Sequence, residues 1–305
     1  MYYRPGATFH LASHSDLLPG PKALSTTGRY AEYYQFGLPG ADSRREGVFL
    51  ATPNHVLDPE RDTLRRFWPR RERHEAMLGD AVDAFAARVA AAVAGFARRA
   101  PLIVSLTAGL DSRTTLAALN GRADLRSFTY DINLERTTVK TAAADMMAGD
   151  RLARIVGARH RRFACAWAET PPPPPDYTHV RSLFDDYPRE FGRDAFLHVR
   201  SNVSEVARRF WRKRIPGRVF AAKDFVMKGG PAPAEAAAHA QTQMVHHLDR
   251  LGYDPLRGDR LMGYDTADLF YWEHRMPSWH GPLLLGSDPA FDTGVIFNSH
   301  CVLEA

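Results

Sequence analysis

The sequence predicts an α/β fold: a doubly wound, mostly parallel sheet with a small N-terminal β appendage and a helical C-terminal part. Three observations lead to this prediction. Short apolar runs alternate with helix-like segments between residues 72 and 211. Residues 101–106 form a continuous apolar run, which is typical of a parallel strand covered on both faces. Residues 1–70 are rich in Pro, Gly and Tyr. Strands that alternate with helices favour parallel pairing through crossover connections.

The segment before residue 71 is expected to form short strands joined by turns, for example at residues 47–51. Between residues 72 and 99, apolar side chains recur every three or four positions, which predicts a long helix with one buried stripe. That stripe consists of Leu78, Val82, Phe85, Val89, Val93 and Phe96. We therefore divide the chain into a β-rich segment, 1–70, and a main domain, 71–305.

The remaining elements follow in a regular order after the strand at 101–106. Helices are expected at 110–119, 141–156 and 203–211, and strands at 125–130, 160–165 and 195–199. Five consecutive prolines at 171–175 exclude a helix or an inner strand, so this stretch is expected to be a surface loop. A helix of roughly twenty residues is expected after residue 231, and the chain from 265 onward is expected to be helical.

The composition of the 305 residues limits the class of protein. A hydrophobic content of 45% is ample for a core, and the two cysteines are too far apart in sequence to indicate a disulfide framework or a zinc site. No run of about 18 apolar residues occurs and the N-terminus does not resemble a signal peptide, so we expect a cytoplasmic protein. The net charge of +5 indicates either an anionic partner or only the Arg and Ala enrichment that a GC-rich genome produces. The pair His246-His247 is interpreted as part of a solvated helix face.

A short loop between the strand at 101–106 and the helix at 110–119 has the features of an anion site. Free backbone N–H groups at a helix start, together with the helix dipole, attract phosphate. The loop consists of Thr107, Ala108, Gly109, Leu110, Asp111, Ser112 and Arg113. Its hydroxyls and Arg113 add donors, and Asp111 would be a Mg²⁺ ligand because phosphate alone would repel it. An ordinary strand-to-helix turn with Asp111 as a cap is the alternative.

This TAGLDSR loop resembles the S-G-G-x-D-S loop of the PP-loop ATP pyrophosphatases. The chain around it is similar to the asparagine synthetase C-terminal (synthetase) domain. The similarity extends to the segments 47–58, 66–69, 153–160, 268–276 and 288–293. Thr107 keeps the hydroxyl of the usual first Ser, whereas Ala108 adds a methyl group where the family has Gly, so we expect less room in the loop.

The resemblance implies an adenine nucleotide alpha hydrolase-like sheet with strand order 3-2-1-4-5, and it implies ATP and Mg²⁺ as cofactors. Adenine would lie near Phe128, Thr129 and Tyr130. The second acidic motif of the family falls on residues 200–205, where Glu205 is the clear acid that remains. Glu205, as a second metal ligand, and Ser201 would face the nucleotide. Alternatively, Glu205 is a carboxylate that only favours a helix start.

The resemblance also suggests candidates for catalytic side chains elsewhere in the chain. Lys223 and Lys228 are the candidates for the catalytic lysine of the family, although a surface lysine is the better interpretation for either one alone. A cation at that position would stabilise negative charge on the phosphates. Glu273 and Arg275 would orient the substrate or pair with each other.

The function implied is that of an AMP-forming amide ligase. A substrate carboxylate attacks the α-phosphorus of ATP, pyrophosphate leaves, and an amine then displaces AMP from the acyl-adenylate. The family's glutaminase domain needs Cys at position 2, whereas this chain has Tyr2, and 70 residues are too few for that domain. Nitrogen would therefore come from ammonia, an amine substrate or a separate partner protein. Neither a nucleic-acid nor a membrane partner is expected, and a homodimer is left open.

Two other functions remain open at this point. A PP-loop enzyme that modifies tRNA would suit the basic composition, but the thiolating members need a cysteine pair, and Cys165 and Cys301 show no such signature. A non-catalytic nucleotide-binding or scaffold relative would suit the scarcity of acids at 200–205. Asp111 and Ser112 argue against this last interpretation.

Overall fold

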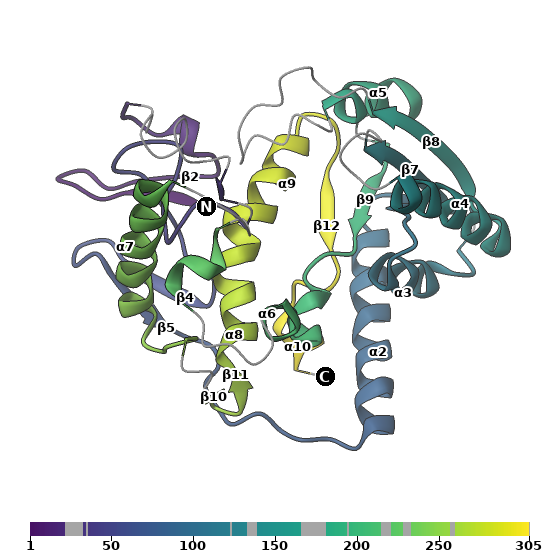
Figure 1. The fold of residues 1–305 in the computed structure, drawn as a ribbon. Coiled ribbons are helices and arrows are strands. Elements are labelled where there is room, and N and C mark those ends of the chain that lie inside the picture. Colours follow the sequence, from purple (N-terminus) through teal and green to yellow (C-terminus); the bar gives the residue numbers. More distant parts are fainter. Residues whose placement is uncertain are drawn as a thin grey trace. The chain divides into compact units, whose positions relative to one another are not determined.

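We describe the protein from a computed structural model, which divides the chain into two compact units. The structure describes residues 1–21, 33–34, 36–122, 124–132, 139–165, 181–193, 195–214, 221–227, 233–256 and 260–304. Unit 1 contains the described parts of 1–73 and 206–285, and unit 2 contains those of 74–205 and 286–304. Each unit is described by itself (Figure 1).

Unit 2 is built on a five-stranded sheet in which all neighbouring strands are parallel. Its strands are β6 (Leu102–Ser105), β7 (Arg126–Ile132), β8 (Arg159–Cys165), β9 (Leu197–Arg200) and β12 (Thr293–Val295). From one edge to the other the order is β12-β9-β6-β7-β8, so β6 is the middle strand. The predicted α/β class with a parallel sheet is therefore confirmed. The edge strand β12 was not predicted, because the chain from residue 265 onward was expected to be helical.

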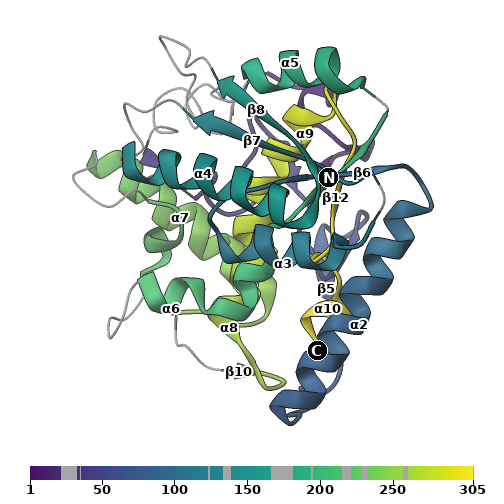
Figure 2. The ribbon, with the colours of Figure 1, turned by 90° about the vertical axis from the view of Figure 1, so that its right-hand side faces the viewer.

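The helices of unit 2 contact this sheet or one another (Figure 2). They are α2 (Leu78–Ala97), α3 (Leu110–Leu119), α4 (Val139–Val156), α5 (Arg181–Phe191) and α10 (His300–Leu303). Helix α3 contacts β6 and β9, whereas α4 contacts β7 and β8. The close approach of α4 requires Gly149, because a Cβ atom there would collide with the Thr129 hydroxyl of β7.

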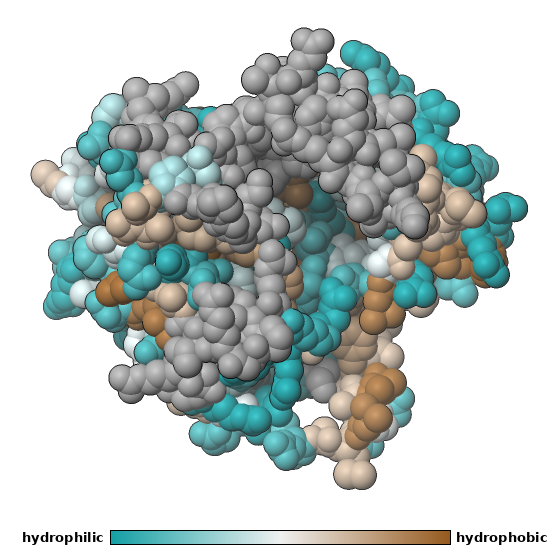
Figure 3. All heavy atoms as spheres, in the orientation of Figure 1, coloured by the Kyte–Doolittle hydropathy of each residue, from teal (hydrophilic) through white to brown (hydrophobic). Residues whose placement is uncertain are grey.

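The long helix α2 departs from the prediction at its N-terminal end. Val89 and Val93 are buried as expected, but Leu78 and Val82 are 79% and 55% exposed. Figure 3 shows an apolar surface over this end of the helix. The apolar repeat correctly indicated a helix, but it did not indicate how much of the stripe other parts of unit 2 cover.

Unit 1 contains the small antiparallel sheets expected near the N-terminus. The first sheet has the order β2-β1-β3, with β1 at Tyr2–Arg4, β2 at His10–Ala12 and β3 at Phe49–Leu50. Two strand pairs follow, β4 (His55–Asp58) with β5 (Thr63–Arg66), and β10 (Arg260–Leu261) with β11 (Tyr264–Asp265). A short 3₁₀ helix, η1, spans Ser15–Leu17. The β-rich character of the first 70 residues is thus confirmed.

The helical part of unit 1 is centred on two long helical stretches. One is α7 (Ala234–Leu251); the other runs from α8 (Thr266–Phe270) through the π-helix η6 (Tyr271–His280) into α9 (Gly281–Ser287). The predicted helix at 203–211 is instead split into the 3₁₀ helix η4 (Ser204–Arg208) and α6 (Phe210–Arg214). A further 3₁₀ helix, η5, spans Ala222–Phe225. Within the described residues, no helix is long and apolar enough to cross a membrane.

The contacts group the chain differently from the division into 1–70 and 71–305. Residues 206–285 associate with the N-terminal strands rather than with the parallel sheet. The physical reason is visible in unit 1, where α7 packs on β5 and the Glu273 carboxylate of η6 binds Arg66 of β5. His247 of α7 is only 5% exposed, so the interpretation of His246-His247 as a solvated face is wrong for the second histidine.

Candidate functional site

The loop between β6 and α3 lies at the carboxyl end of the middle strand of the sheet, as the sequence indicated. The Leu106 N–H donates to the Phe128 carbonyl at 2.8 Å, which carries the pairing with β7 one residue past the end of β6. Gly109 then starts α3 as an N-cap with extended backbone angles of φ −65° and ψ 151°. The first-turn N–H groups of a helix have no acceptor within the helix, so this end of α3 is suited to an anion.

Two hydroxyl groups fix the shape of this loop. The Ser112 Oγ accepts from the Thr107 N–H at 3.2 Å and lies 3.0 Å from the Thr107 Oγ1. The Thr107 Oγ1 also accepts from the Gly109 N–H at 3.1 Å. Thr107 therefore supplies a hydroxyl on which the shape of the loop depends. Both hydroxyls hold the backbone of the loop.

One loop amide already binds a carboxylate. The Ala108 N–H donates to the Asp145 Oδ1 of α4 at 2.7 Å. A hydrogen bond to a charged acceptor is stronger than a neutral one, and the negative charge occupies a position that a phosphate oxygen would also favour. Asp145 was not predicted, because the loop motif lies 37 residues earlier in the chain and no sequence spacing connects the two.

Asp111 connects the loop after β6 with the loop after β9. The Ser204 Oγ donates to the Asp111 Oδ1 at 2.6 Å. This contact follows from the parallel pairing of β6 with β9, which brings the carboxyl ends of both strands to the same edge. Val203, the residue before Ser204, has a φ of 85°, which is strained for a β-branched side chain. The structure thus brings Asp111 to residues 200–205, through a serine that the sequence reasoning missed.

The other residues predicted near this loop differ in exposure. Glu205 lies in η4, directly after Ser204, and is partly buried. Ser201 is 9% exposed, and its Oγ has no hydrogen-bond partner within the described parts of the chain. The exposed Arg113 folds back, and its Nε donates to the Gly109 carbonyl at 3.3 Å. Leu110 is 56% exposed at the start of α3.

The three residues predicted near adenine do not share one environment. Phe128 is fully buried, with its ring against those of Tyr187 and His198. Thr129 is 1% exposed, and its hydroxyl donates to the Leu106 carbonyl at 2.8 Å. Tyr130 is partly buried. The side chains of Phe128 and Thr129 thus belong to the core, which leaves Tyr130 as the side chain of the three with some surface.

The remaining predicted residues belong to unit 1, apart from Lys228, which lies outside the described residues. Lys223 is exposed in η5, and its backbone N–H donates to the Gln241 Oε1 at 3.3 Å. Glu273 and Arg275 lie in the π-helix η6, a rare conformation that often occurs at functional sites. Their surroundings differ: Glu273 contacts polar side chains, whereas Arg275 contacts aromatic rings.

Glu273 is held in a buried polar network. Its carboxylate accepts hydrogen bonds from the Arg66 Nη1 at 2.5 Å and Nη2 at 2.8 Å. It also accepts from the Asn54 Nδ2 at 2.9 Å and from the Tyr253 hydroxyl at 2.8 Å. Glu273 is only 1% exposed. Burial first, and then the Glu273 charge, raise the pKa of Tyr253, so this hydroxyl stays protonated as a donor. The principal ionic partner of Glu273 is therefore Arg66 of β5.

Arg275 is enclosed by aromatic rings of unit 1. Its guanidinium carbon lies 4.1 Å from the ring centre of Trp279, 4.5 Å from Phe36, 4.8 Å from Phe210 and 5.6 Å from Tyr271. Cation–π contacts of this kind stabilise a desolvated guanidinium. Since Arg275 is only 7% exposed, it is placed as a core residue of unit 1.

Within the described residues, no group of three or more His, Cys, Asp or Glu side chains is arranged to hold a metal ion. No known protein-family model and no curated protein sequence matches this chain.

Proposed function

We propose that this protein is an ATP-dependent, AMP-forming amide ligase, which adenylates a small-molecule carboxylate and transfers it to ammonia or an amine. The observation that carries the proposal is the connection from β6 through residues 107–109 to α3, at the carboxyl end of the middle strand. In an open parallel sheet, ligands bind at this edge, next to the point where the strand order reverses.

The topology of unit 2 supports the comparison with the PP-loop enzymes. Counted along the chain, the five strands of the sheet have the order 3-2-1-4-5, which is the order that the resemblance implies. The reversal lies between β6 and β9, and the Ser204–Asp111 hydrogen bond lies there too. Residues from both loops would then share one ligand.

In this proposal, the first-turn N–H groups of α3 bind phosphate oxygens and Arg113 adds positive charge beside them. Asp111 is the residue that would hold Mg²⁺, which needs only one or two protein carboxylates when phosphates supply other ligands. When bound, Mg²⁺ would neutralise negative charge on the phosphates. The Asp145 carboxylate supports the assignment of this loop as an anion site, because its oxygen already accepts a hydrogen bond from one loop amide.

Substrate positioning accounts for most of the catalysis that such a site supplies. Ser204 orients the Asp111 carboxylate by its 2.6 Å hydrogen bond. Asp145 must release the Ala108 N–H before a phosphate oxygen can take its place. Glu205 would approach the phosphates from the second loop as a further metal ligand.

A non-catalytic nucleotide-binding relative is the second candidate. It is favoured by the Asp145–Ala108 hydrogen bond, which satisfies the loop without any nucleotide. Residues 200–205 also contain a single acid, Glu205. Turnover, rather than binding, separates this candidate from the ligase.

The deciding experiment supplies Mg·ATP with a panel of small carboxylates and either ammonia or amines, and follows AMP and pyrophosphate by mass spectrometry. We expect AMP and pyrophosphate in equal amounts, and a loss of about 100-fold or more in Asp111→Asn, on the scale of losing a group that stabilises transition-state charge. Asp83→Asn, an exposed carboxylate of α2, is the matched control and should retain full activity.

Two results would contradict the ligase. Formation of ADP in place of AMP would mean a different phosphoryl transfer, and equal activity of the Asp111→Asn protein would exclude this loop as the site. Binding of Mg·ATP without any turnover across the panel would favour the non-catalytic relative.

A further inference from the structure

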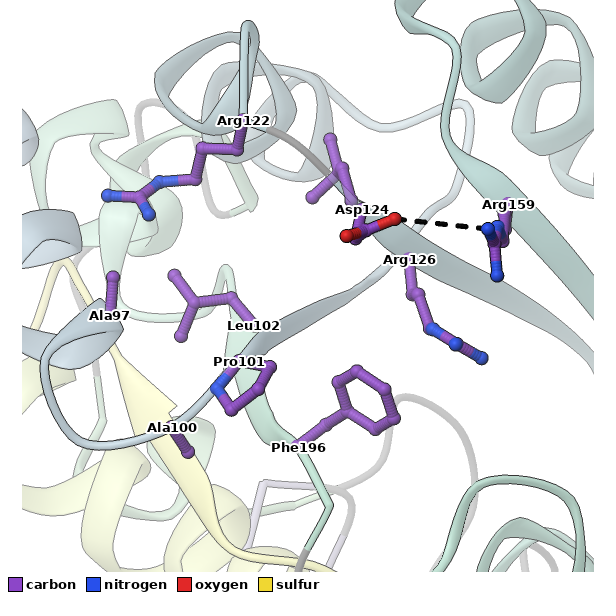
Figure 4. A pocket seen from close by; sticks show the side chains of 10 residues that line it. Ala97, Ala100, Pro101, Leu102, Arg122, Asp124, Arg126, Arg159 and Phe196 are labelled. Atoms are coloured by element: carbon purple, nitrogen blue, oxygen red, sulfur yellow. Dashed lines mark ion pairs between the residues drawn. The ribbon is translucent and has the colours of Figure 1, made fainter.

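Unit 2 contains a pocket at the amino ends of the strands of this sheet, on the side away from the loop at 107–113. Its volume is about 420 Å³, within the range of about 300–1,000 Å³ typical of small-molecule sites. Leu102, Arg126 and Arg159 are the first residues of β6, β7 and β8, and Phe196 directly precedes β9 (Figure 4). Three parallel strands and the residue before a fourth therefore each contribute a side chain to one pocket.

The pocket carries an excess of positive charge. Arg122, Arg126 and Arg159 line it together with a single acid, Asp124. The Arg159 Nη2 lies 3.8 Å from the Asp124 Oδ1. These side chains are 70% and 82% exposed, so the attraction within this ion pair is weak. The charge on Arg122 and Arg126 is thus left to attract an anion.

Arg126 is the central donor. Its guanidinium carbon lies 4.9 Å from the centre of the Phe196 ring, which orients the planar group. Its Nε is buried and has no hydrogen-bond partner within the described residues. Buried donors are normally satisfied in folded proteins, so an unsatisfied arginine donor at a pocket indicates a missing acceptor.

The rest of the wall is apolar. Phe196, Leu102 and Pro101 line it, with two alanines of the segment that ends α2. Figure 4 shows Arg122 on the opposite side of this apolar floor from Arg126 and Arg159. A ligand here would need an apolar body as well as a charged end.

We propose that this pocket binds a small organic anion, with its carboxylate or phosphate group on Arg126 and a flat apolar body against Phe196 and Pro101. It is a different site from the loop at 107–113. At about 3.3 Å per strand residue, Leu102 and Thr107 lie roughly 16 Å apart along the chain direction. The inference does not depend on the proposed ligase activity.

The test uses benzoate, phenyl phosphate and the neutral benzyl alcohol as probes, measured by calorimetry and ligand-detected NMR on the whole chain. We expect saturable binding of at least one anion, and binding of benzyl alcohol weaker by about tenfold or more, since charge-assisted hydrogen bonds are lost. Whichever of benzoate and phenyl phosphate binds more tightly identifies the charged group.

Arg126→Gln shortens the side chain, keeps a polar end group and removes the charge, and it should weaken binding of the preferred anion by about tenfold. Arg122→Gln, at an exposed position across the apolar floor, should weaken it by less than Arg126→Gln does, with no effect on the thermal unfolding midpoint. Arg151→Gln, an exposed arginine of α4 away from the pocket, is the control matched in charge and should bind as the unmodified protein does.

Three results would overturn the proposal. An equal loss in the Arg126 and Arg151 variants would mean general attraction to a basic chain. Equal binding of benzyl alcohol would mean an apolar site without anion recognition, and absence of saturable binding by both anions would mean no site at all.

Discussion

The Glu273 network in unit 1 and the loop around Asp111 in unit 2 contain the same kinds of groups but are organised in opposite ways. Glu273 is 1% exposed and accepts hydrogen bonds from three other residues, Arg66, Asn54 and Tyr253. The Ala108 amide of the loop is held by one partly exposed carboxylate, that of Asp145. In the first region several partners surround a buried carboxylate, whereas in the second a single partly exposed carboxylate holds one backbone amide.

This difference affects how easily each charge can be separated from its partner. A buried ion pair is costly to break, because either partner alone is left desolvated and unpaired. A partly exposed carboxylate on a loop amide can return to water at little cost. Charged residues in an unusual helix, such as Glu273 and Arg275 in η6, therefore do not by themselves mark an active site.

Glu273→Gln should produce the largest effect of any substitution considered. The change keeps the shape of the side chain but leaves Arg66 as a buried, uncompensated cation, so we expect a loss of about 3–5 kcal/mol in the free energy of unfolding. Urea unfolding followed by circular dichroism measures it. Glu60→Gln, on the exposed β4–β5 turn, is the matched control and should change stability by less than about 0.5 kcal/mol.

The double variant Arg66→Met with Glu273→Leu tests the reason for that loss. Since both charges are then absent, most of the stability should return. A double variant as unstable as Glu273→Gln would mean that shape, and not charge, is what Glu273 contributes.

Asp268→Asn should have a smaller effect, and one that depends on pH. Burial first, and then the neighbouring Asp265, raise the pKa of Asp268 to about 7, although Arg209 and Arg212 oppose this. Below its unfolded-state pKa of 3.8, Asp268 is protonated in both states and has no effect. Between 3.8 and about 7 only the unfolded state releases the proton, so stability falls as the pH rises, and the penalty is complete above 7.

Asparagine imitates the protonated form, so the substitution should remove that penalty. We expect a gain of about 2 kcal/mol at pH 8 and almost none at pH 4; the full shift in pKa would imply more, but the carboxyl is partly exposed. Urea unfolding at the two pH values measures the difference. A gain of the same size at both would show that ionisation of Asp268 is not its source.

Local patterns were sufficient to predict most of the parallel sheet. The apolar run at 101–106 and the start of α3 at Leu110 were both correctly placed, because strand and helix signals meet there without ambiguity. The edge strand β12 was missed, since its three residues lie within a segment dominated by helical and aromatic residues. Exposure was also hard to predict, as Leu78 shows, because it depends on what packs against a helix and not on the helix itself.

The candidate site was predictable only where it is contiguous in sequence. Thr107 and Ser112 are brought together by the turn that they both belong to, so the motif was enough to indicate them. Asp145 and Ser204 reach the loop through the packing of α4 and the pairing of β9, neither of which leaves a spacing in the sequence. The burial of the Phe128 side chain could not be predicted for a related reason, because position along a strand does not reveal which face is buried when both are.

Asp145→Asn tests whether the loop is open to a ligand. If the carboxylate competes with phosphate for the Ala108 N–H, its neutralisation should strengthen the binding of Mg·ATP by about tenfold, or about 1.4 kcal/mol, in calorimetry without a carboxylate substrate. The gain should be larger for ATP without Mg²⁺, because no cation then screens the repulsion between Asp145 and the phosphates. Asp185→Asn, an exposed carboxylate of α5, should leave the affinity unchanged. Weaker binding in Asp145→Asn would instead mean that Asp145 is itself a ligand of the metal, in addition to Asp111 and Glu205.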